Sequence, residues 1–307
     1  MSSLLVRGGH RLTGRIEPSA NKNAVLPVLC ATLLTDAPVR LRNVPEITDV
    51  ERIVRFFGEL GSTIDWDRAD KVLTIDHSTI PAGARATLPQ AMRASIMMIP
   101  GLLVRLGEAR LEHEVKGCTL GAREIDPHVE VFRAFGAEVG QDGREIVFRV
   151  TGKGQAARMW LEYASVTTTE NFILSALTVK GTSQIVNAAC EPHVQEMCDF
   201  LQACGATIIG KGTSMVSVEG GAKLGGADYT FNDDFHEIAT FLALSAVTGG
   251  DISVRNGCPE HFDLIDRTFG KFGADVEHAD GWSRLAAPER LKVRENFTSH
   301  LITKVEA

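Results

Sequence analysis

Four segments of this chain follow one plan, and this repetition is the strongest constraint on how the chain can fold. Each segment has a short strand, a loop, an amphipathic helix that ends at a glycine, and a further β-rich stretch. The glycines that close the helices, Gly61, Gly136, Gly205 and Gly273, recur 75, 69 and 68 residues apart. A nearly fixed period of this kind is typical of a fold that uses one supersecondary unit several times.

Local signals support the helix assignments. In residues 191–204, Val194, Met197 and Leu201 lie on one face at helical spacing. Pro192 suits a first turn, where its missing N–H group costs little, and a glycine after the last turn is a common left-handed cap. The amphipathic helices are therefore predicted over residues 47–60, 129–135, 191–204 and 259–272.

A second and more apolar helix precedes the first strand of each repeat. These helices are predicted over residues 23–34, 89–106, 168–179 and 234–247. Because they are too apolar to stand alone in water, we expect the repeats to pack around one another and to bury them. The repeating unit thus alternates strands with helices.

Composition excludes several classes of protein. A length of 307 residues suits two domains, and a net charge of -7 without a lysine or arginine cluster argues against nucleic-acid binding. The longest apolar run, residues 24–34, is too short to span a membrane. Six scattered cysteines form no close pair, and the N-terminal residues lack a signal-peptide layout. These features predict free thiols in a reducing compartment and a cytoplasmic location.

A polar stretch, KGCTLGAREIDPH at residues 116–128, distinguishes the second repeat. From strand end to closing glycine the other repeats take 18, 18 and 17 residues, whereas this one takes 23. Two glycines bracket Cys118, and the nearby cations Lys116 and Arg123 favour a thiolate. A buried structural thiol is the alternative interpretation. The insertion favours a functional cysteine, because its sibling repeats lack it.

Polar residues also begin the apolar helices, where free N–H groups and the helix dipole favour anions. Lys22 does not cap a helix, and the dipole disfavours a cation at that end. Arg93 lies in an otherwise apolar segment, where a buried charge needs a partner. These two residues and Arg123 form a candidate phosphate site. For Ser165 and Asp233, simple N-capping is the favoured interpretation.

Several of these stretches resemble the enolpyruvyl transferases. SANKNAVLPVLCATLLTDAPVRLRNVPEITDV resembles the motif with the lysine–asparagine pair, MRASI the arginine-bearing helix, and GCTLGAREID the catalytic loop. SVTTTEN and NAACEPHV resemble the nucleotide-proximal segment and the strand and loop that follow it. The resemblance covers essentially the whole chain. It is greatest to the branch that uses UDP-N-acetylglucosamine, because the branch acting on shikimate 3-phosphate lacks the cysteine loop.

The resemblance implies an α+β fold of two similar domains, each an inside-out α/β barrel of three βαβαββ units with helices inside. One domain is expected over residues 22–230 and the second over residues 1–21 and 231–307. The chain ends at Ala307, soon after a fifth unit begins. We therefore expect a truncated second domain that lacks the family's general-base aspartate.

The implied reaction transfers the enolpyruvyl group of phosphoenolpyruvate to the 3-hydroxyl of UDP-N-acetylglucosamine and releases phosphate, a step of peptidoglycan synthesis. It uses no metal or organic cofactor. By resemblance, Cys118 protonates the methylene carbon and is the thiol that fosfomycin alkylates, and Lys22 and Arg123 assist catalysis. No nucleic-acid or membrane partner is expected, and a monomer is favoured. The implied substrate-binding residues are Asn23, Arg93, Glu124, Ile125, Asp126, Pro127, Tyr163, Ala164, Ser165, Val166, Thr167 and Asp234.

Four positions depart from the family pattern. Glu124 replaces a usual proline and Met97 a common tryptophan. Tyr163 replaces a lysine near the diphosphate, and Thr167 replaces a glycine. Two alternatives therefore stay open: an enolpyruvyl transferase that acts on a different nucleotide in specialised metabolism, and a non-catalytic homologue that only binds a UDP-sugar.

Overall fold

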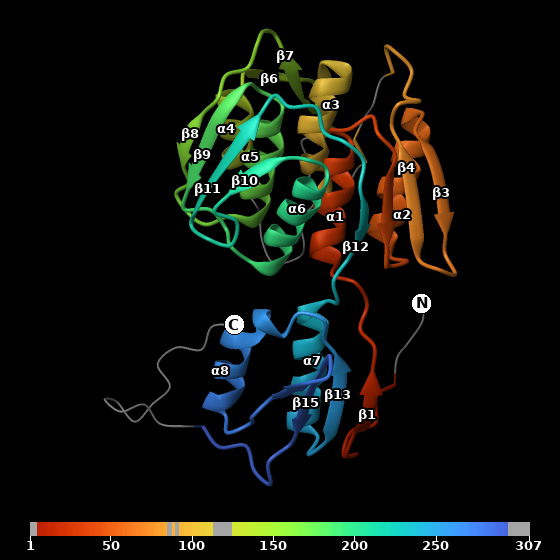
Figure 1. Ribbon diagram of the computed structural model, residues 1–307, viewed down its shortest axis with the longest axis vertical. Helices are drawn as coiled ribbons and strands as arrows, with labels where there is room; N and C mark the ends of the chain where they lie inside the picture. The colour runs from red at the N-terminus through yellow and green to blue at the C-terminus, as the bar shows by residue number, and fades with distance from the viewer. Residues whose placement is uncertain (1–4, 85–87, 90–91, 113–124, 294–307) are drawn as a thin grey trace. The chain divides into compact units, whose positions relative to one another are not determined.

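A computed structural model of the chain describes residues 5–84, 88–89, 92–112 and 125–293. The chain divides into two compact units, residues 22–231 and residues 1–21 with 232–307 (Figure 1). The two stretches that lead from one unit to the other run antiparallel. Ala20 and Asp233 form a bridge between them, and the Asn21 N–H donates to the Asn232 carbonyl at 3.2 Å.

The unit formed by residues 22–231 contains three sheets, one for each of three repeats. The first has the order β12-β2-β4-β3, with β2 (Val39–Arg42), β3 (Thr63–Asp67), β4 (Val72–Asp76) and β12 (Asp228–Thr230). The second has the order β5-β7-β6, with β5 (Glu108–Glu112), β6 (Ala137–Asp142) and β7 (Glu145–Val150). The third has the order β10-β11-β9-β8, with β8 (Arg158–Trp160), β9 (Gly181–Val186), β10 (Thr207–Ile209) and β11 (Met215–Gly220).

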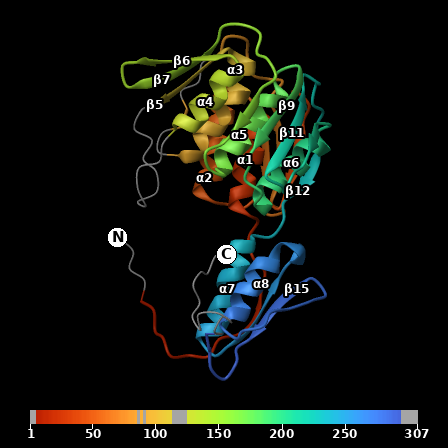
Figure 2. The same ribbon diagram turned by 90° about the vertical axis from the view of Figure 1, so that its left-hand side faces the viewer.

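The helices of this unit lie between its sheets (Figure 2). They are α1 (Lys22–Thr32), α2 (Thr48–Leu60), the 3-10 helix η1 (Arg93–Met98), α3 (Ile99–Leu106), α4 (Asp126–Ala134), α5 (Val166–Leu177) and α6 (Pro192–Ala203). In α1 every residue from Ala24 to Thr32 is buried, and in α5 every residue from Thr168 to Leu177 is buried. The predicted burial of these apolar helices is confirmed.

The unit formed by residues 1–21 and 232–307 has one sheet of order β1-β13-β15-β14. Its elements are β1 (Thr13–Ile16), α7 (Phe235–Val247), β13 (Asp251–Arg255), the 3-10 helix η2 (Pro259–Phe262), α8 (Asp263–Lys271), β14 (Glu277–Ala279) and β15 (Trp282–Ala286). Helix α7 buries Ile238 and Leu242 in the core but leaves Val247 71% exposed. Its predicted burial is therefore only partly correct. The described residues of this unit form a single repeat, which covers one side of the helix.

All four repeats share one backbone feature, and two of them share a second. Gly61, Gly136, Gly205 and Gly273 all have positive φ after an amphipathic helix, as predicted for left-handed caps. At the ends of β2 and β9, Asn43 and Asn187 also adopt positive φ, 61° and 62°. Their Nδ2 atoms donate to the carbonyls of Phe231 and Leu161 at 3.1 and 3.0 Å. Each asparagine thus fixes the end of its strand to the parallel strand beside it.

Two predicted helices are divided in the structure. Residues 259–272 were expected to form one helix, but they form η2 and then α8. Residues 89–106 were expected to form a single α-helix, but η1 covers Arg93–Met98 and α3 begins at Ile99. Pro100 lies in the first turn of α3. Proline has no N–H to donate and its ring clashes with the carbonyl four residues earlier, which accounts for the break here, whereas α1 accommodates Pro27. In the described part of the chain, no helix has the length and apolar character needed to cross a membrane.

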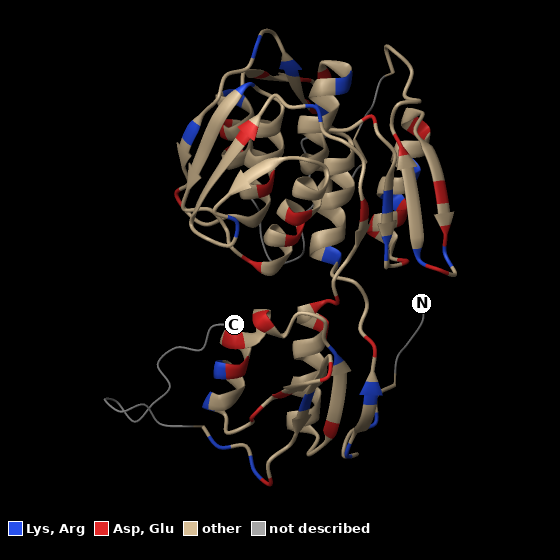
Figure 3. Ribbon diagram, in the orientation of Figure 1, with Lys and Arg blue, Asp and Glu red and all other residues tan. Residues whose placement is uncertain are grey.

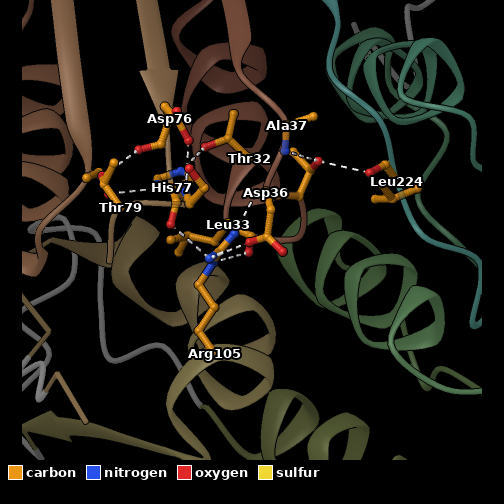
Figure 4. A network of polar contacts seen from close by, with 12 residues as sticks. Thr32, Leu33, Asp36, Ala37, Asp76, His77, Thr79, Arg105 and Leu224 are labelled. Atoms are coloured by element: carbon orange, nitrogen blue, oxygen red, sulfur yellow. Dashed lines mark hydrogen bonds and ion pairs between the residues drawn. The ribbon is translucent and has the colours of Figure 1, made fainter. Parts of the chain in front are cut away.

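Arg105, at the end of α3, ties the second repeat to the first (Figure 4). Its guanidinium donates to the carbonyls of Leu33, Thr35 and His77 and forms an ion pair with Asp36 at 3.0 Å. The first two carbonyls follow the last turn of α1, where backbone acceptors lack helical partners. With a side chain only 11% exposed, Arg105 satisfies acceptors that water cannot readily reach.

Buried His77 forms a second link in this network. The Thr32 hydroxyl donates to the Leu29 carbonyl at 2.6 Å, so its oxygen accepts from His77 Nε2 at 2.8 Å. The remaining ring nitrogen, Nδ1, then accepts from the Ser62 hydroxyl at 2.7 Å. Burial and the Arg105 charge lower the pKa of His77 to about 3. The imidazole is therefore neutral under ordinary conditions.

Replacement of Arg105 by methionine should lower the free energy of unfolding by at least about 3 kcal/mol, because three carbonyls lose a charged donor. Urea denaturation measures the change. The matched control is Arg149→Met, which removes a half-exposed ion pair with Glu108 and should cost less than about 1 kcal/mol. Equal losses in the two variants would contradict the structural role of Arg105.

The depressed pKa of His77 makes stability fall in acid. Between its unfolded value of about 6.5 and its folded value of about 3, the unfolded chain binds a proton that the folded chain excludes. Lowering the pH from 7 to 5 should therefore cost about 2 kcal/mol through this residue alone. The His77→Gln variant should lose about that much less over the same interval. An unchanged pH dependence in urea titrations would refute the assignment.

Candidate functional site

One pocket within residues 22–231 gathers the first turns of several helices. It has a volume of about 400 Å³ and is lined by Lys22 and Asn23 of α1, Thr167 of α5 and His193 of α6. Helix η1 contributes Met97 to the wall. The starts of α1, α5 and α6 therefore face one cavity. Unpaired N–H groups and aligned dipoles at helix starts favour negative charge, so the pocket suits an anion.

Lys22 holds its position through an ion pair. Its Nζ lies 2.6 Å from Oδ2 of Asp49, which is in the first turn of α2. The lysine side chain is 50% exposed and the aspartate 27% exposed. Asp49 offsets the unfavourable placement of a cation at the start of α1. An anion that approaches Lys22 therefore competes with the Asp49 carboxylate, which is already paired with the ammonium group.

The start of α5 is fixed by its own cap. Ser165 is the N-cap residue, and its hydroxyl accepts from the Thr168 N–H and lies 2.8 Å from the Thr168 hydroxyl. The capping interpretation of Ser165 is confirmed. Val166 and Thr167 follow directly and line the pocket. The cap thereby places the first turn of α5 against the cavity.

Buried His128 connects the start of α4 to the start of α5. Its Nδ1 lies 2.8 Å from Nδ2 of Asn171, and its Nε2 lies 3.3 Å from the Thr167 hydroxyl. Since the amide donates to Nδ1, the proton is on Nε2 and points to Thr167. Burial lowers the pKa of His128 to about 4, so the ring is neutral at pH 7. These hydrogen bonds hold residues 125–127, at the start of α4, beside the predicted nucleotide segment.

Other predicted site residues lie in less enclosed positions. Ile125 is the N-cap of α4, and Asp126 and Pro127 begin its first turn, three residues before the predicted start at residue 129. Tyr163 is 56% exposed in the loop before α5, and Ala164 beside it is also exposed. These positions agree with a surface that a ligand can reach. Their binding roles remain predictions.

Asp234 belongs to the other unit, where it caps α7. Its Oδ1 accepts from the N–H groups of His236 and Glu237 at 2.8 and 3.4 Å. The expected cap at Asp233 was therefore wrong by one residue. Asp233 instead accepts two hydrogen bonds from Arg255, at 2.8 and 3.2 Å. The Asp233 carboxylate is bound by Arg255 and therefore does not cap the helix.

Four predicted residues cannot be placed in full. Cys118, Arg123 and Glu124 lie outside the described residues. The backbone of Arg93 begins η1, but its side chain also lies outside what is described. The candidate phosphate site formed by Lys22, Arg93 and Arg123 therefore stays a prediction, as does the catalytic role of Cys118.

Sequence reasoning missed three residues that line the pocket, Asp49, Glu170 and His193. Glu170 carried a detectable signal, since it is the one charged residue in the apolar segment VTTTENFILSAL of α5. The same argument had singled out Arg93. Asp49 and His193 lie on amphipathic helices, where polar residues are ordinary, so no local signal distinguished them.

Comparison with known proteins identifies the fold family. The family model described as EPSP synthase (3-phosphoshikimate 1-carboxyvinyltransferase) matches residues 6–304. The chain belongs to the EPSP synthase family. The resemblance to enolpyruvyl transferases drawn from its motifs is thereby confirmed.

Curated relatives within this family carry one name. The protein named UDP-N-acetylglucosamine 1-carboxyvinyltransferase from Borreliella burgdorferi is 34% identical over 304 residues, 98% of this chain and 70% of the relative. The protein of the same name from Bacteroides thetaiotaomicron is 31% identical over 312 residues, 100% of this chain and 72% of the relative. This chain thus spans about 70% of the length of these members of the EPSP synthase family.

Solved structures of the family share the fold. The enolpyruvyl transferase NikO from Streptomyces tendae superposes with a TM-score of 0.80 at 19% identity, over 94% of this chain and 68% of the other. An EPSP synthase from Acinetobacter baumannii gives a TM-score of 0.69 at 17% identity, over 91% and 64%. The predicted α+β fold of enolpyruvyl transferases is confirmed by these neighbours.

The Lys22–Asp49 pair leads to a binding prediction. Asp49→Asn removes a negative charge from the pocket and releases the ammonium group, so affinity for inorganic phosphate should rise about three- to tenfold. Isothermal titration calorimetry measures it. Asp70→Asn, in the exposed turn between β3 and β4, is the control and should change nothing. Unchanged or weaker phosphate binding by Asp49→Asn would show that the pair does not compete with the anion.

Proposed function

We propose that this protein transfers the enolpyruvyl group of phosphoenolpyruvate to the 3-hydroxyl of UDP-N-acetylglucosamine and releases phosphate. The observation that carries the proposal is the 31–34% identity to proteins named UDP-N-acetylglucosamine 1-carboxyvinyltransferase over essentially the whole chain. The pocket supports it, because its convergent helix starts suit the phosphate and carboxylate groups that both substrates carry. The reaction is part of peptidoglycan synthesis, and we place it in the cytoplasm.

The proposed chemistry is addition followed by elimination. The 3-hydroxyl oxygen attacks C2 of phosphoenolpyruvate and loses its proton, while the C3 methylene gains one. In the second step C3 loses a proton, the C2–C3 double bond returns, and phosphate leaves from C2. Carbon protonation is assigned to the Cys118 thiol. Lys22 and the helix starts offset the negative charge of the phosphate and carboxylate, as preorganised dipoles do in many enzymes.

The remaining residues act in binding. Asn23, at the start of α1, lines the pocket, and we assign it to contact with the sugar. The His128–Thr167 contact holds the start of α4 next to the start of α5, the two segments assigned to the uridine diphosphate. Neutral His128 gives this region a donor without charge, so it positions the segments rather than neutralising the diphosphate. We propose that the neighbouring Tyr163 and Ala164 lie at the outer edge of the same subsite.

A second candidate is the same chemistry on a different nucleotide. The observation that favours it is Thr167, which carries a side chain bonded to His128 at a pocket position that is usually glycine by the motif resemblance. An added side chain changes the space left for the sugar or diphosphate. Competition of uridine nucleotides with and without the sugar separates the two acceptors. Tighter binding of another nucleotide than of UDP-N-acetylglucosamine would favour this candidate.

Replacement of Cys118 by serine should lower phosphate release by at least about 100-fold, because the positioned proton donor is lost. It should leave UDP-N-acetylglucosamine binding within about threefold of the original chain, since the thiol is assigned to chemistry and not to the nucleotide. A coupled phosphate assay and calorimetry measure the two quantities. Cys190→Ser, which alters an exposed cysteine, is the control and should retain both.

Fosfomycin provides an independent readout. The unsubstituted chain and Cys190→Ser should each gain one adduct by intact mass, faster with UDP-N-acetylglucosamine present, and Cys118→Ser should gain none. Nucleotide binding without phosphate release would contradict the catalytic proposal and leave a binding protein. Absence of both would contradict the proposed substrates altogether.

A further inference from the structure

A buried acid lies in the wall of the pocket. Glu170 is 1% exposed and lies on α5, one turn after Val166. It is the one ionisable residue of α5, and the only charged residue of α1 is Lys22, at its start (Figure 3). Its Oε1 atom has no hydrogen-bond partner among the described residues. A buried, unpaired acceptor in a core helix is costly, of the order of 1–3 kcal/mol.

The groups packed around Glu170 do not neutralise it. Glu191, at the N-cap of α6, repels it, and its own Oε2 is also buried without a partner among the described residues. Cys30 of α1 and Cys198 of α6 also feel the charge of Glu170. Of the remaining charged or titratable groups in the same wall, Lys22 is paired with Asp49, and His193 adds a ring that is 6% exposed.

These surroundings determine the protonation state. Burial, followed by the charge of Glu191, raises the pKa of Glu170 well above its usual value. Glu170 therefore holds the proton, and its neutral carboxyl group carries an O–H donor in a pocket suited to anions.

A purely structural role does not explain this residue. A leucine or methionine of similar volume would fill the same space without an orphaned acceptor, and such replacements of buried polar groups are often neutral or stabilising. A neutral acid beside a cavity has a different use. It donates to an anionic oxygen without the repulsion that a carboxylate would cause, which makes it a selective partner for phosphate or carboxylate.

We propose that Glu170 is a substrate-binding residue that, as a neutral carboxylic acid, donates a hydrogen bond to an anionic oxygen of the substrate in this pocket. The inference rests on the proposed function, because it takes the pocket to be the substrate site. The shared chemistry is a phosphate or carboxylate oxygen. Its two possible sources are phosphoenolpyruvate and the diphosphate of the nucleotide, and the experiment distinguishes them.

The proposal has a consequence for pH. A bound anion next to Glu170 favours the protonated acid, so affinity for that anion must fall as the pH rises through the pKa of the free residue. Glutamine keeps a donor at the same place but cannot ionise. Leucine keeps the volume but removes the donor. The two substitutions therefore separate hydrogen bonding from titration and from packing.

The test measures binding of phosphoenolpyruvate, inorganic phosphate and UDP by calorimetry between pH 6 and pH 9. It compares the unsubstituted chain with Glu170→Gln and Glu170→Leu, and uses Glu130→Gln and Glu130→Leu on the exposed side of α4 as matched controls. Glu170→Leu should weaken one class of probe at least tenfold. Glu170→Gln should bind within about threefold at pH 6 and lose the pH dependence of the unsubstituted chain.

The probes identify the source of the anion. Weakening of phosphoenolpyruvate and phosphate alone assigns the contact to the enolpyruvyl donor, and weakening of UDP alone assigns it to the diphosphate. Urea titration checks folding, and Glu170→Leu should be at least as stable as the unsubstituted chain. Equal binding of all three probes by Glu170→Leu and the unsubstituted chain overturns this inference alone. Failure of the unsubstituted chain to bind any probe contradicts the proposed function, and the inference with it.

Discussion

Burial of α1 and α5 is the constraint on which the rest of the larger unit depends. Both helices are buried on every side after their first turn and are mostly apolar there, so they are stable only when protein surrounds them. Three sheets from three repeats supply that cover. Their first turns are the parts that escape enclosure, and the pocket is formed there. The burial of these helices thus leaves their first turns, whose N–H groups suit an anion, in the wall of one pocket.

Electrostatics in the pocket follow from the same burial. Lys22 at the edge keeps a carboxylate partner and remains half exposed. Glu170 in the wall, and His128 in contact with Thr167 of the wall, cannot keep a charge, because burial disfavours it for acid and base alike. The result is a gradient from charged groups at the rim to neutral donors inside. Such an arrangement accepts an anion without fixing a counterion in the core.

Sequence alone predicted the repeats, the helices and their closing glycines because these depend on local chemistry. Periodic apolar residues and left-handed caps can be recognised within about a dozen positions of sequence. The predicted caps are present at Gly61, Gly136, Gly205 and Gly273. Pro100 also gave a local signal for the end of one helix and the start of the next. The prediction of a single helix followed the apolar run around it instead. The first turns of α1 and α5 were predicted to be site elements through motif resemblance.

What sequence did not predict depends on contacts between distant residues. The Lys22–Asp49 pair joins two helices, and the cap of α7 moved to Asp234 because Arg255, from a later strand, holds Asp233. Glu170 was overlooked since a single acid in an apolar helix acquires its meaning only when the cavity beside it is known. These features require the tertiary structure.

The strand pairing of the two units affects the order in which the chain can fold during synthesis. β1 is translated long before its parallel partner β13. Thr13 therefore cannot pair with Asp251 until β13 has been synthesised. Likewise β2 cannot pair with its parallel partner until β12 has been synthesised, because Arg40 pairs with Asp228. Neither sheet can close until β12 and β13 have been translated, and long-range parallel pairing is intrinsically slow. The nascent chain therefore carries unpaired sheet edges for much of its synthesis, a state that chaperones are suited to protect.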